Sequence, residues 1–414
     1  MTAHDASDPA PRLAIVGSGP AGCYLAQHLS RRAPDAEIVI FDRLATPYGL
    51  FRYGVAPDHQ GTKTTAKQFD RLFEKRGVVF VGGVEVGTDL PLETLTELFD
   101  VTVLATGLSQ DRPLGIPGGD LPQVLGAGRL VRFLNGHPDE YDDQPRIEGD
   151  VVVIGLGNVA VDVVRLLAKT DGELDGSDAD PDVWERTVGP IRSITVVSRS
   201  GPDAVKADAL MLRELADLRR ARFAVRGLGD DESASATAQA FLDLEHTSSD
   251  GDLAVTFLLN TTPVEVDGTH RVTAVRVRSG DGVDELAADT VITAIGFLPE
   301  NPVTELPRVQ RAGWLAHGPV GAIPVHRVRA AELADAIVAE LARDIGRRPR
   351  PGVAGLPAGL LKGATTFEGW RRIDAAETAS PPAGRVRRKL RSAAELADVA
   401  HGRNTNESGN GTLT

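Results

Sequence analysis

Short runs of consecutive apolar residues, each followed by a glycine-rich turn and a helical segment, recur along the chain. The first run covers 13–16 and precedes an expected helix at 23–32. The second covers 151–154 and precedes another helical segment. Unbroken apolar runs of this length, bounded by glycine turns, are typical of parallel strands that are buried on both faces. The pattern therefore predicts an α/β protein built from strand–turn–helix units.

Other stretches of the sequence predict further strands, a loop and a hairpin turn. Two strand ends are alike: Leu104-Ala105-Thr106-Gly107 and Ala294-Ile295-Gly296. This likeness suggests that the chain leaves a first domain after the first of them and returns to it after the second. The stretch 227–252 is rich in Asp, Ser, Ala and Gly, which predicts a loop. Further strands are expected at 37–41, 100–107, 193–197, 254–259, 272–277 and 289–297, with a hairpin turn at 281–282.

These elements predict two domains, with the second inserted into the first. The first domain is expected in two segments, 11–107 and 296–400, and the inserted domain at 108–295. Residues 1–10 and 401–414 are expected to be a disordered leader and a disordered tail. The fold class is therefore α/β, with two Rossmann-like three-layer domains that bind dinucleotides.

Two of the turns carry a glycine fingerprint. The first is Gly17-Ser18-Gly19-Pro20-Ala21-Gly22, and the second is Gly155-Leu156-Gly157-Asn158-Val159-Ala160. In such a turn the glycines let the backbone approach a pyrophosphate, and N–H groups at the start of the helix donate to it. One fingerprint is weak evidence, because glycine turns after strands are common. Two of them, each with its own strand and helix, predict that a flavin and a nicotinamide dinucleotide bind together.

The residue after the second strand of each unit indicates which nucleotide binds there. Asp42 lies about 20 residues after Gly22, where a Rossmann unit places an acid that holds ribose hydroxyls. The alternative is a solvated turn aspartate. In the second unit Arg199 and Ser200 take this place, and an arginine there pairs with a 2′-phosphate. This favours NADP over NAD, with a plain surface arginine as the alternative.

Composition and charge narrow the class of protein. The 414 residues, 44 of them glycine, suffice for two domains with cores. A net charge of −13 argues against nucleic acid as a partner. No apolar run reaches the roughly 18–20 residues that a membrane span needs, and the N-terminus lacks the apolar segment of a secretory signal. A cytoplasmic location is therefore expected.

The single cysteine, Cys23, limits the redox chemistry of the chain. It excludes a disulfide framework and a redox-active cysteine pair. Cysteine-bound iron–sulfur or zinc sites are excluded as well, so no metal site is expected and any metal must belong to a partner protein. Cys23 itself is expected to pack in the first helix. A basic run at 385–389 is either a solvated surface segment or a docking face for an acidic electron carrier.

Several longer motifs point to one family. The block Thr46-Pro47-Tyr48-Gly49-Leu50-Phe51-Arg52-Tyr53-Gly54-Val55-Ala56-Pro57-Asp58-His59 is far more specific than either glycine fingerprint. The other motifs are Ala105-Thr106-Gly107, Ile116-Pro117-Gly118, Asn135-Gly136-His137-Pro138, 155–162, Gly313-Trp314, Gly318-Pro319-Val320-Gly321, Phe367-Glu368-Gly369-Trp370 and Ile373-Asp374. On these residues, which run in order over 11–400, the chain resembles the adrenodoxin-reductase-like ferredoxin–NADP reductases, flavoproteins of the glutathione-reductase type.

The resemblance implies FAD in the first domain and NADPH in the second. Hydride would pass from NADPH to the flavin, and single electrons would then pass to a ferredoxin-like iron–sulfur protein or a flavodoxin, feeding a cytochrome P450 or a biosynthetic system. The FAD-binding residues so implied are Gly17, Gly19, Pro20, Ala21, Gly22, Asp42, Gly49, Leu50, Val55, Thr106, Gly107, Trp314, Gly321 and Ile323. Those for NADPH are Gly155, Gly157, Asn158, Val159, Arg199 and Ser200.

The resemblance also implies a pair of catalytic residues, His59 and Glu214, near the nicotinamide. Such a pair could orient the ring or relay a proton. The alternative for His59 is a turn histidine bonded to the backbone. For Trp314, which would border the flavin, the alternative is a core aromatic at a turn.

The sequence departs from the family pattern at Ser200, at Pro324-Val325-His326 and at Met211, which stands where the family has a second acidic residue on the helix after Arg199. The family shows two arginines where this chain has Arg199 and Ser200, and losing one charge-assisted contact costs roughly 1.5–3 kcal/mol, so NADH binding with weaker selectivity is expected. Where the family has a Gly-Thr-Asn turn, this chain has Pro324-Val325-His326, and proline lacks an N–H donor. Two alternatives stay open: a flavin-dependent monooxygenase or oxidase, and a degenerate FAD-binding module with little activity.

Overall fold

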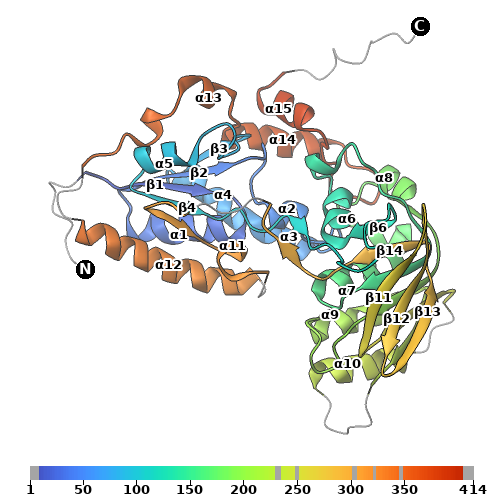
Figure 1. Ribbon diagram of the computed structural model, residues 1–414. Helices are drawn as coiled ribbons and strands as arrows, with labels where there is room; N and C mark the ends of the chain where they lie inside the picture. The colour runs from blue at the N-terminus through green and yellow to red at the C-terminus, as the bar shows by residue number, and fades with distance from the viewer. Residues whose placement is uncertain are drawn as a thin grey trace.

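The computed structural model describes residues 9–228, 235–247, 251–300, 305–319, 323–344 and 348–403. Most of the expected leader and tail, and also Gly321, lie outside these residues. The elements form two α/β halves, each with its own sheet and helices (Figure 1).

The first half is a five-stranded parallel sheet between two layers of helices. Its strands in sheet order are β16 (Val309–Arg311), β4 (Val101–Leu104), β1 (Arg12–Val16), β2 (Glu37–Asp42) and β3 (Val79–Gly82). Helices α1 (Pro20–Arg32) and α12 (Ile323–Arg343) pack on one face, and α5 (Leu92–Leu98) and α13 (Ala358–Gly363) on the other (Figure 1). Apolar side chains alternate between the two faces of β1, so both layers bury part of it.

The second half is a six-stranded parallel sheet with a different layer on each face. Its strands in sheet order are β6 (Val124–Gly126), β14 (Thr290–Thr293), β7 (Ile147–Ile154), β8 (Val188–Val197), β10 (Leu253–Leu258) and β9 (Ala221–Arg226). One face carries α6 (Ala127–Leu134), α7 (Asn158–Ala168), α9 (Ala209–Glu214) and α10 (Ala236–Glu245). The other carries an antiparallel meander of β11 (Thr261–Gly268), β12 (Val272–Ser279) and β13 (Gly282–Ala287).

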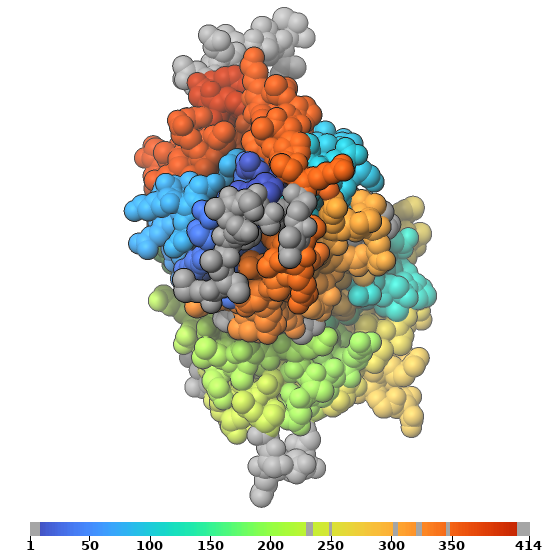
Figure 2. All heavy atoms as spheres, turned by 90° about the vertical axis from the view of Figure 1, so that its left-hand side faces the viewer, coloured from blue at the N-terminus to red at the C-terminus, as the bar shows by residue number. Residues whose placement is uncertain are grey.

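The chain enters and leaves the second half through a two-stranded antiparallel ribbon, β5 (Gln110–Asp111) with β15 (Phe297–Leu298). The remaining helices are α2 (Leu50–Tyr53), α3 (Gln60–Thr64), α4 (Asp70–Lys75), α8 (Pro181–Thr187), α11 (Trp314–His317), α14 (Phe367–Ala379) and α15 (Ala393–Ala400). Short 3-10 turns cover Thr65–Phe69, Pro138–Glu140, Asp171–Leu174, Leu215–Asp217 and Gly352–Gly355. Figure 2 shows residues from both ends of the chain, in blue and orange-red, together in the first half, above the green and yellow residues of the second.

These observations confirm the expected fold class, because β16 returns to the first sheet after the whole second half has been formed. The loop expected at 227–252 is wrong in part, since α10 lies within it and buries Phe241 and Leu244. Its apolar spacing is helical, but polar flanks obscured the pattern. Cys23 is fully buried in α1, as expected, and burial raises the pKa of its thiol. Within the described ranges, no helix is long and apolar enough to cross a membrane.

A buried ion cluster joins three parts of the chain. Asp178, in the second half, accepts hydrogen bonds from Lys63 of α3 and Lys389 of the C-terminal segment, each at 2.9 Å. Both ammonium groups also donate to the carbonyl oxygen of Arg52, at 3.2 and 3.1 Å. The guanidinium of Arg52 pairs in turn with the buried carboxylate of Glu377 at 2.5 Å. A buried charge without its partner is costly, so this cluster holds the two halves and the C-terminal segment together.

The charges of the cluster shift one another's pKa values. Burial alone would raise the pKa of Asp178, but the charges of Lys389 and Lys63 outweigh it and lower the pKa to about 2. Burial lowers the pKa of both Lys63 and Lys389, and Asp178 offsets this only in part.

The expectation of a solvated segment at 385–389 is wrong in part, because Arg385 and Lys389 are buried whereas Val386 and Arg388 are exposed. Arg385 is buried and pairs with Asp171 and Asp175. Lys389 is the second buried lysine of the ion cluster. Because Arg385 and Lys389 are paired with acids of the same chain, their charges are not free for an acidic carrier at the surface.

Replacing Asp178 by Asn should destabilise the protein by about 3–5 kcal/mol at pH 7, because two buried ammonium groups then lack a counter-charge. Chemical unfolding measures this loss. Because the pKa of Asp178 is lower in the folded chain, its stabilisation is complete above the unfolded value of about 4 and disappears as the pH falls towards 2.

Asp171→Asn is the matched control for this substitution. Asp171 also binds a cation of the C-terminal segment, Arg385, but its side chain is 72% exposed. Its replacement should therefore cost less than about 1 kcal/mol. Equal losses for the two variants would contradict the structural role given to Asp178.

Candidate cofactor site

The first glycine fingerprint is shaped so that the start of α1 faces open space. Gly17 has a φ of +107°, and a Cβ there would lie 2.4 Å from the carbonyl oxygen of Ala105. A Cβ on Gly22 would lie 2.0 Å from the carbonyl oxygen of Gly17, so Gly22 lets the helix pack against the turn. At Gly19 an added Cβ would have no atom within 4 Å. The first N–H groups of α1 are therefore open to an anionic ligand.

A cavity of about 800 Å³ lies beside this turn, at the carboxyl ends of β1, β2 and β4. Its volume and place are those of a large cofactor site in a doubly wound sheet. The expected site residues that line it are Gly17, Gly19, Pro20, Ala21, Asp42, Gly49, Leu50, Thr106, Gly107, Val159 and Trp314. Gly22 lies behind the turn, and Val55 uses its carbonyl oxygen to accept a hydrogen bond from the Asn135 amide at 2.9 Å. Ile323 is the first residue of α12.

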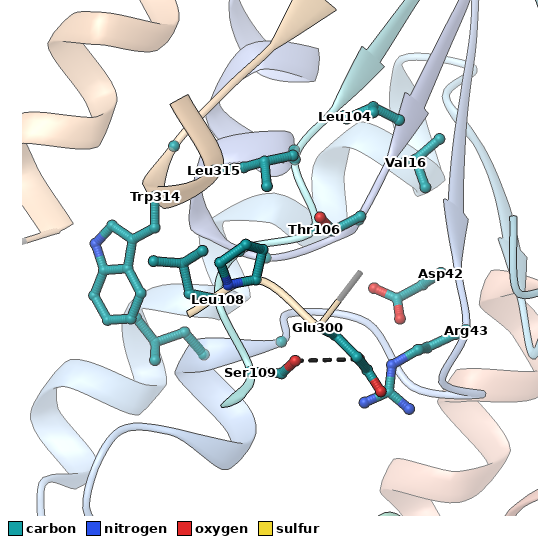
Figure 3. Close-up of a pocket in the computed structure, with 18 of the residues that line it drawn as sticks. Val16, Asp42, Arg43, Leu104, Thr106, Leu108, Ser109, Glu300, Trp314 and Leu315 are labelled. Carbon is teal, nitrogen blue, oxygen red and sulfur yellow. Dashed lines mark hydrogen bonds between the residues drawn. The ribbon is translucent and has the colours of Figure 1, made fainter. Parts of the chain in front are cut away.

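One end of the cavity is polar (Figure 3). Asp42 is 9% exposed and accepts hydrogen bonds from the N–H groups of Ser18 and Leu44, both at 2.9 Å, and from the Ser18 hydroxyl. Burial raises the pKa of Asp42, and these hydrogen bonds oppose that shift. Arg43, the next residue, pairs with Asp139 at 2.5 Å. The alternative of a solvated turn aspartate is therefore wrong for Asp42.

The opposite end of the cavity is aromatic. Trp314 of α11 stacks on Phe297 of β15 with ring centroids 5.8 Å apart, and the ring of His326 lies 6.3 Å from Trp314. The indole Nε1 and the His326 Nδ1 are buried, and neither has a hydrogen-bond partner in the part of the chain that the structure describes. The two rings themselves line the cavity, so they offer a bound aromatic ring a flat apolar contact. Together with the fingerprint turn, this end fits the flavin of FAD.

His59 and Glu214 come together where the two halves meet. His59 lies just before α3 of the first half, and its Nε2 is 3.6 Å from the carboxylate of Glu214, the last residue of α9. The other ring nitrogen of His59 is 3.6 Å from Asp162 of α7. Both ring nitrogens therefore face carboxylates, which differs from the alternative of a turn histidine bonded to the backbone.

Sequence reasoning missed the residues that support this pair. Arg165, one turn after Asp162 on α7, contacts it at 2.8 Å and binds both oxygens of Asp58 at 2.9 Å. Lys169 adds a third contact to Asp58 at 2.7 Å, and these cations lower the pKa of Asp58 in spite of its burial. Their spacing of three and four residues on one helix face was visible in the sequence, but their partner was not.

The second glycine fingerprint repeats the geometry of the first. Gly155 has a φ of +105°, and a Cβ there would lie 2.4 Å from the carbonyl oxygen of Ala294. Asn158 begins α7, and its side-chain oxygen accepts a hydrogen bond from the N–H of Asp208 at 2.8 Å. The next residue, Val159, lines the cavity of the first half. The start of α7 therefore borders that cavity.

The end of β8 carries an exposed cation near the second fingerprint. Arg199 is exposed and forms no ion pair with any residue that the structure describes. Ser200 is uncharged, and its N–H and carbonyl groups both bond with the hydroxyl of Ser198. An unpaired guanidinium next to a phosphate-binding turn is suited to a phosphate ligand.

Comparison with known proteins connects these features to a family. A family model described as pyridine nucleotide-disulphide oxidoreductase matches residues 11–199. Cindoxin reductase of Citrobacter braakii is 40% identical over 97% of this chain and 93% of its own length. The mitochondrial NADPH:adrenodoxin oxidoreductase of Arabidopsis thaliana is 30% identical over 88% of this chain and 89% of its own.

A solved structure agrees with these relatives. Mycobacterium tuberculosis FprA in complex with NADPH superposes with a TM-score of 0.86 at 29% identity, covering 95% of this chain and 100% of that one. The match extends over both halves and over the C-terminal segment, so it is not confined to the dinucleotide folds. The chain therefore belongs to the adrenodoxin-reductase-like ferredoxin–NADP reductases, a family of flavoprotein oxidoreductases.

Proposed function

We propose that the protein transfers a hydride from NADPH to bound FAD and then passes the electrons singly to a ferredoxin-like iron–sulfur protein. One observation carries this proposal: Val159, next to the start of α7, lines the cavity that begins at the Gly17 turn. A nucleotide bound at the second fingerprint would therefore extend towards a flavin in the first. When bound, the flavin supplies the link between a two-electron donor and a one-electron acceptor.

The two ends of the cavity support one orientation of FAD. Asp42 would hold the ribose of the adenosine, and the Gly17 turn would hold the pyrophosphate. Trp314 would border the flavin ring at the aromatic end. The other residues proposed for FAD are Gly19, Pro20, Ala21, Gly22, Gly49, Leu50, Val55, Thr106, Gly107, Gly321 and Ile323.

His59 and Glu214 are proposed to orient the nicotinamide. His59 lies between Glu214 and Asp162, at 3.6 Å from each, so the two carboxylates would favour one position of its ring as NADPH binds. Transfer of a hydride requires no acid or base from the protein, and neither residue is expected to be indispensable. Gly155, Gly157, Asn158 and Val159 would contact the NADPH pyrophosphate, and Arg199 the 2′-phosphate, beside Ser200.

The names of the relatives support an acceptor of the ferredoxin type. A flavodoxin as an alternative acceptor, a cytochrome P450 or biosynthetic enzyme downstream, and a cytoplasmic location are further proposals that rest on the family resemblance. The degenerate-module alternative loses support, because Pro324 falls in the first turn of α12. There the helix N–H groups have no intrahelical partner and proline is well tolerated.

Anaerobic rapid mixing of the yellow protein with NADPH, followed at the visible absorbance of the flavin, tests the proposed function. We expect fast bleaching, then reoxidation that is rapid with a ferredoxin and slow with oxygen. Rapid reaction with oxygen would instead favour an oxidase or monooxygenase. Bound FAD that NADPH does not bleach would favour the degenerate module, and reoxidation by a flavodoxin alone would change the acceptor.

Gly19→Ala should leave the stability of the cofactor-free protein unchanged and weaken FAD binding at least about tenfold, or about 1.4 kcal/mol. The reason is that an added Cβ meets no protein atom within 4 Å but occupies the space that the pyrophosphate needs. FAD fluorescence titration measures the affinity. Gly22→Ala is the contrasting variant, because its Cβ would lie 2.0 Å from a backbone oxygen, and it should lower stability first.

Arg199→Ala should raise the KM for NADPH by roughly ten- to a hundredfold, the loss of one charge-assisted hydrogen bond. The KM for NADH should stay the same, because NADH lacks the 2′-phosphate. Steady-state reduction of a ferredoxin or a dye measures both constants. Arg226→Ala, at the exposed end of β9 two strands away, is the matched control. An equal effect on both nucleotides would remove Arg199 from this role.

A further inference from the structure

His326 is a buried histidine at the aromatic end of the cavity. It is 5% exposed, it lines the cavity, and its ring centroid lies 6.3 Å from that of Trp314. Its Nδ1 has no hydrogen-bond partner among the described residues. The imidazole therefore forms part of the wall of the aromatic end, where a bound ring would contact it.

The surroundings of His326 disfavour the protonated form of its imidazole. Burial lowers the pKa of His326, and the charges of Arg329 on the same helix and His317 on α11 lower it further. No described carboxylate forms an ion pair with this histidine. A negative charge placed beside it would reverse this balance, because an opposite charge nearby favours the protonated form.

We propose that His326 hydrogen-bonds to the flavin ring and takes up one proton when the flavin is reduced. The inference rests on the proposed function, because it requires FAD in this cavity. A hydride from NADPH brings two electrons and one hydrogen to a neutral ring and leaves it with one negative charge. A proton from solvent then binds His326 and balances that charge.

The proton leaves His326 again when the two electrons pass, one at a time, to the iron–sulfur carrier. The hydrogen that arrived with the hydride is released to solvent as a proton in the same half-reaction, so atoms and charges balance. An asparagine at this position, as in the family pattern, could donate a hydrogen bond but could not bind a proton in this pH range. In this chain, flavin reduction is coupled to protonation of a side chain.

The pH dependence of the flavin midpoint potential, measured on the FAD-bound protein by dye equilibration, tests this coupling. At pH values between the pKa of His326 in the oxidised protein and its pKa in the reduced protein, the potential of the wild type should fall more steeply with rising pH than that of His326→Asn. The two slopes should differ by about 30 mV per pH unit, which corresponds to one extra proton per two electrons and to a tenfold change in the equilibrium constant per pH unit. His317→Asn, which removes an exposed histidine nearby, should keep the steep slope.

The slopes and the FAD content of the two proteins distinguish the possible outcomes. Equal slopes for the wild type and His326→Asn, with FAD bound in both, overturn the proton coupling but leave the proposed function intact. A wild-type protein that binds no FAD overturns the proposed function instead. Should His326→Asn lose FAD, NMR of the labelled wild-type histidines decides the question. The pKa of His326 should be higher in the reduced protein than in the oxidised one, and equal values overturn the inference.

Discussion

The carboxylate that Asp178 shares with two lysines is the interaction on which the arrangement of the halves depends. Lys63 belongs to the segment that carries His59, whereas Asp178 belongs to the half that carries Glu214. A rotation of one half against the other would separate a buried anion from buried cations, at a cost of several kcal/mol. The distance between the residues proposed to meet NADPH is therefore set by buried charge as well as by apolar packing.

The glycine fingerprints of the two halves have the same backbone conformation. In each, the first glycine has a φ close to +105°, and its missing Cβ allows the turn to touch the small-residue end of another strand. Ala105 provides that contact in the first half and Ala294 in the second. These contacts join the turn to the preceding strand and to the neighbouring strand end. The phosphate-binding turn is therefore already formed before any ligand binds.

Features that depend on residues close together in the sequence could be predicted from it. The fingerprints, the acid at Asp42 and the repeated strand ends are short patterns with local causes, and the structure has each of them where it was expected. Contacts between charges distant in the chain could not be predicted, because the sequence does not show which residues meet. The lysines on Asp178 come from positions 63 and 389, and the sequence did not show that Lys389, within a basic run expected at the surface, is buried.

The ribbon of β5 and β15 gives the second half a further property. Asp111 lies where the chain enters the second half and Phe297 where it leaves, and the two residues are paired in the ribbon. The Asp111 carboxylate also accepts hydrogen bonds from the N–H groups of Gly128 and Arg129, both at 2.8 Å. The inserted chain therefore starts and finishes at one place, and closing it adds little loop entropy to the first half. During synthesis the insert can fold as a finished unit while the first sheet still lacks its edge strand, which is made last and then pairs with β4.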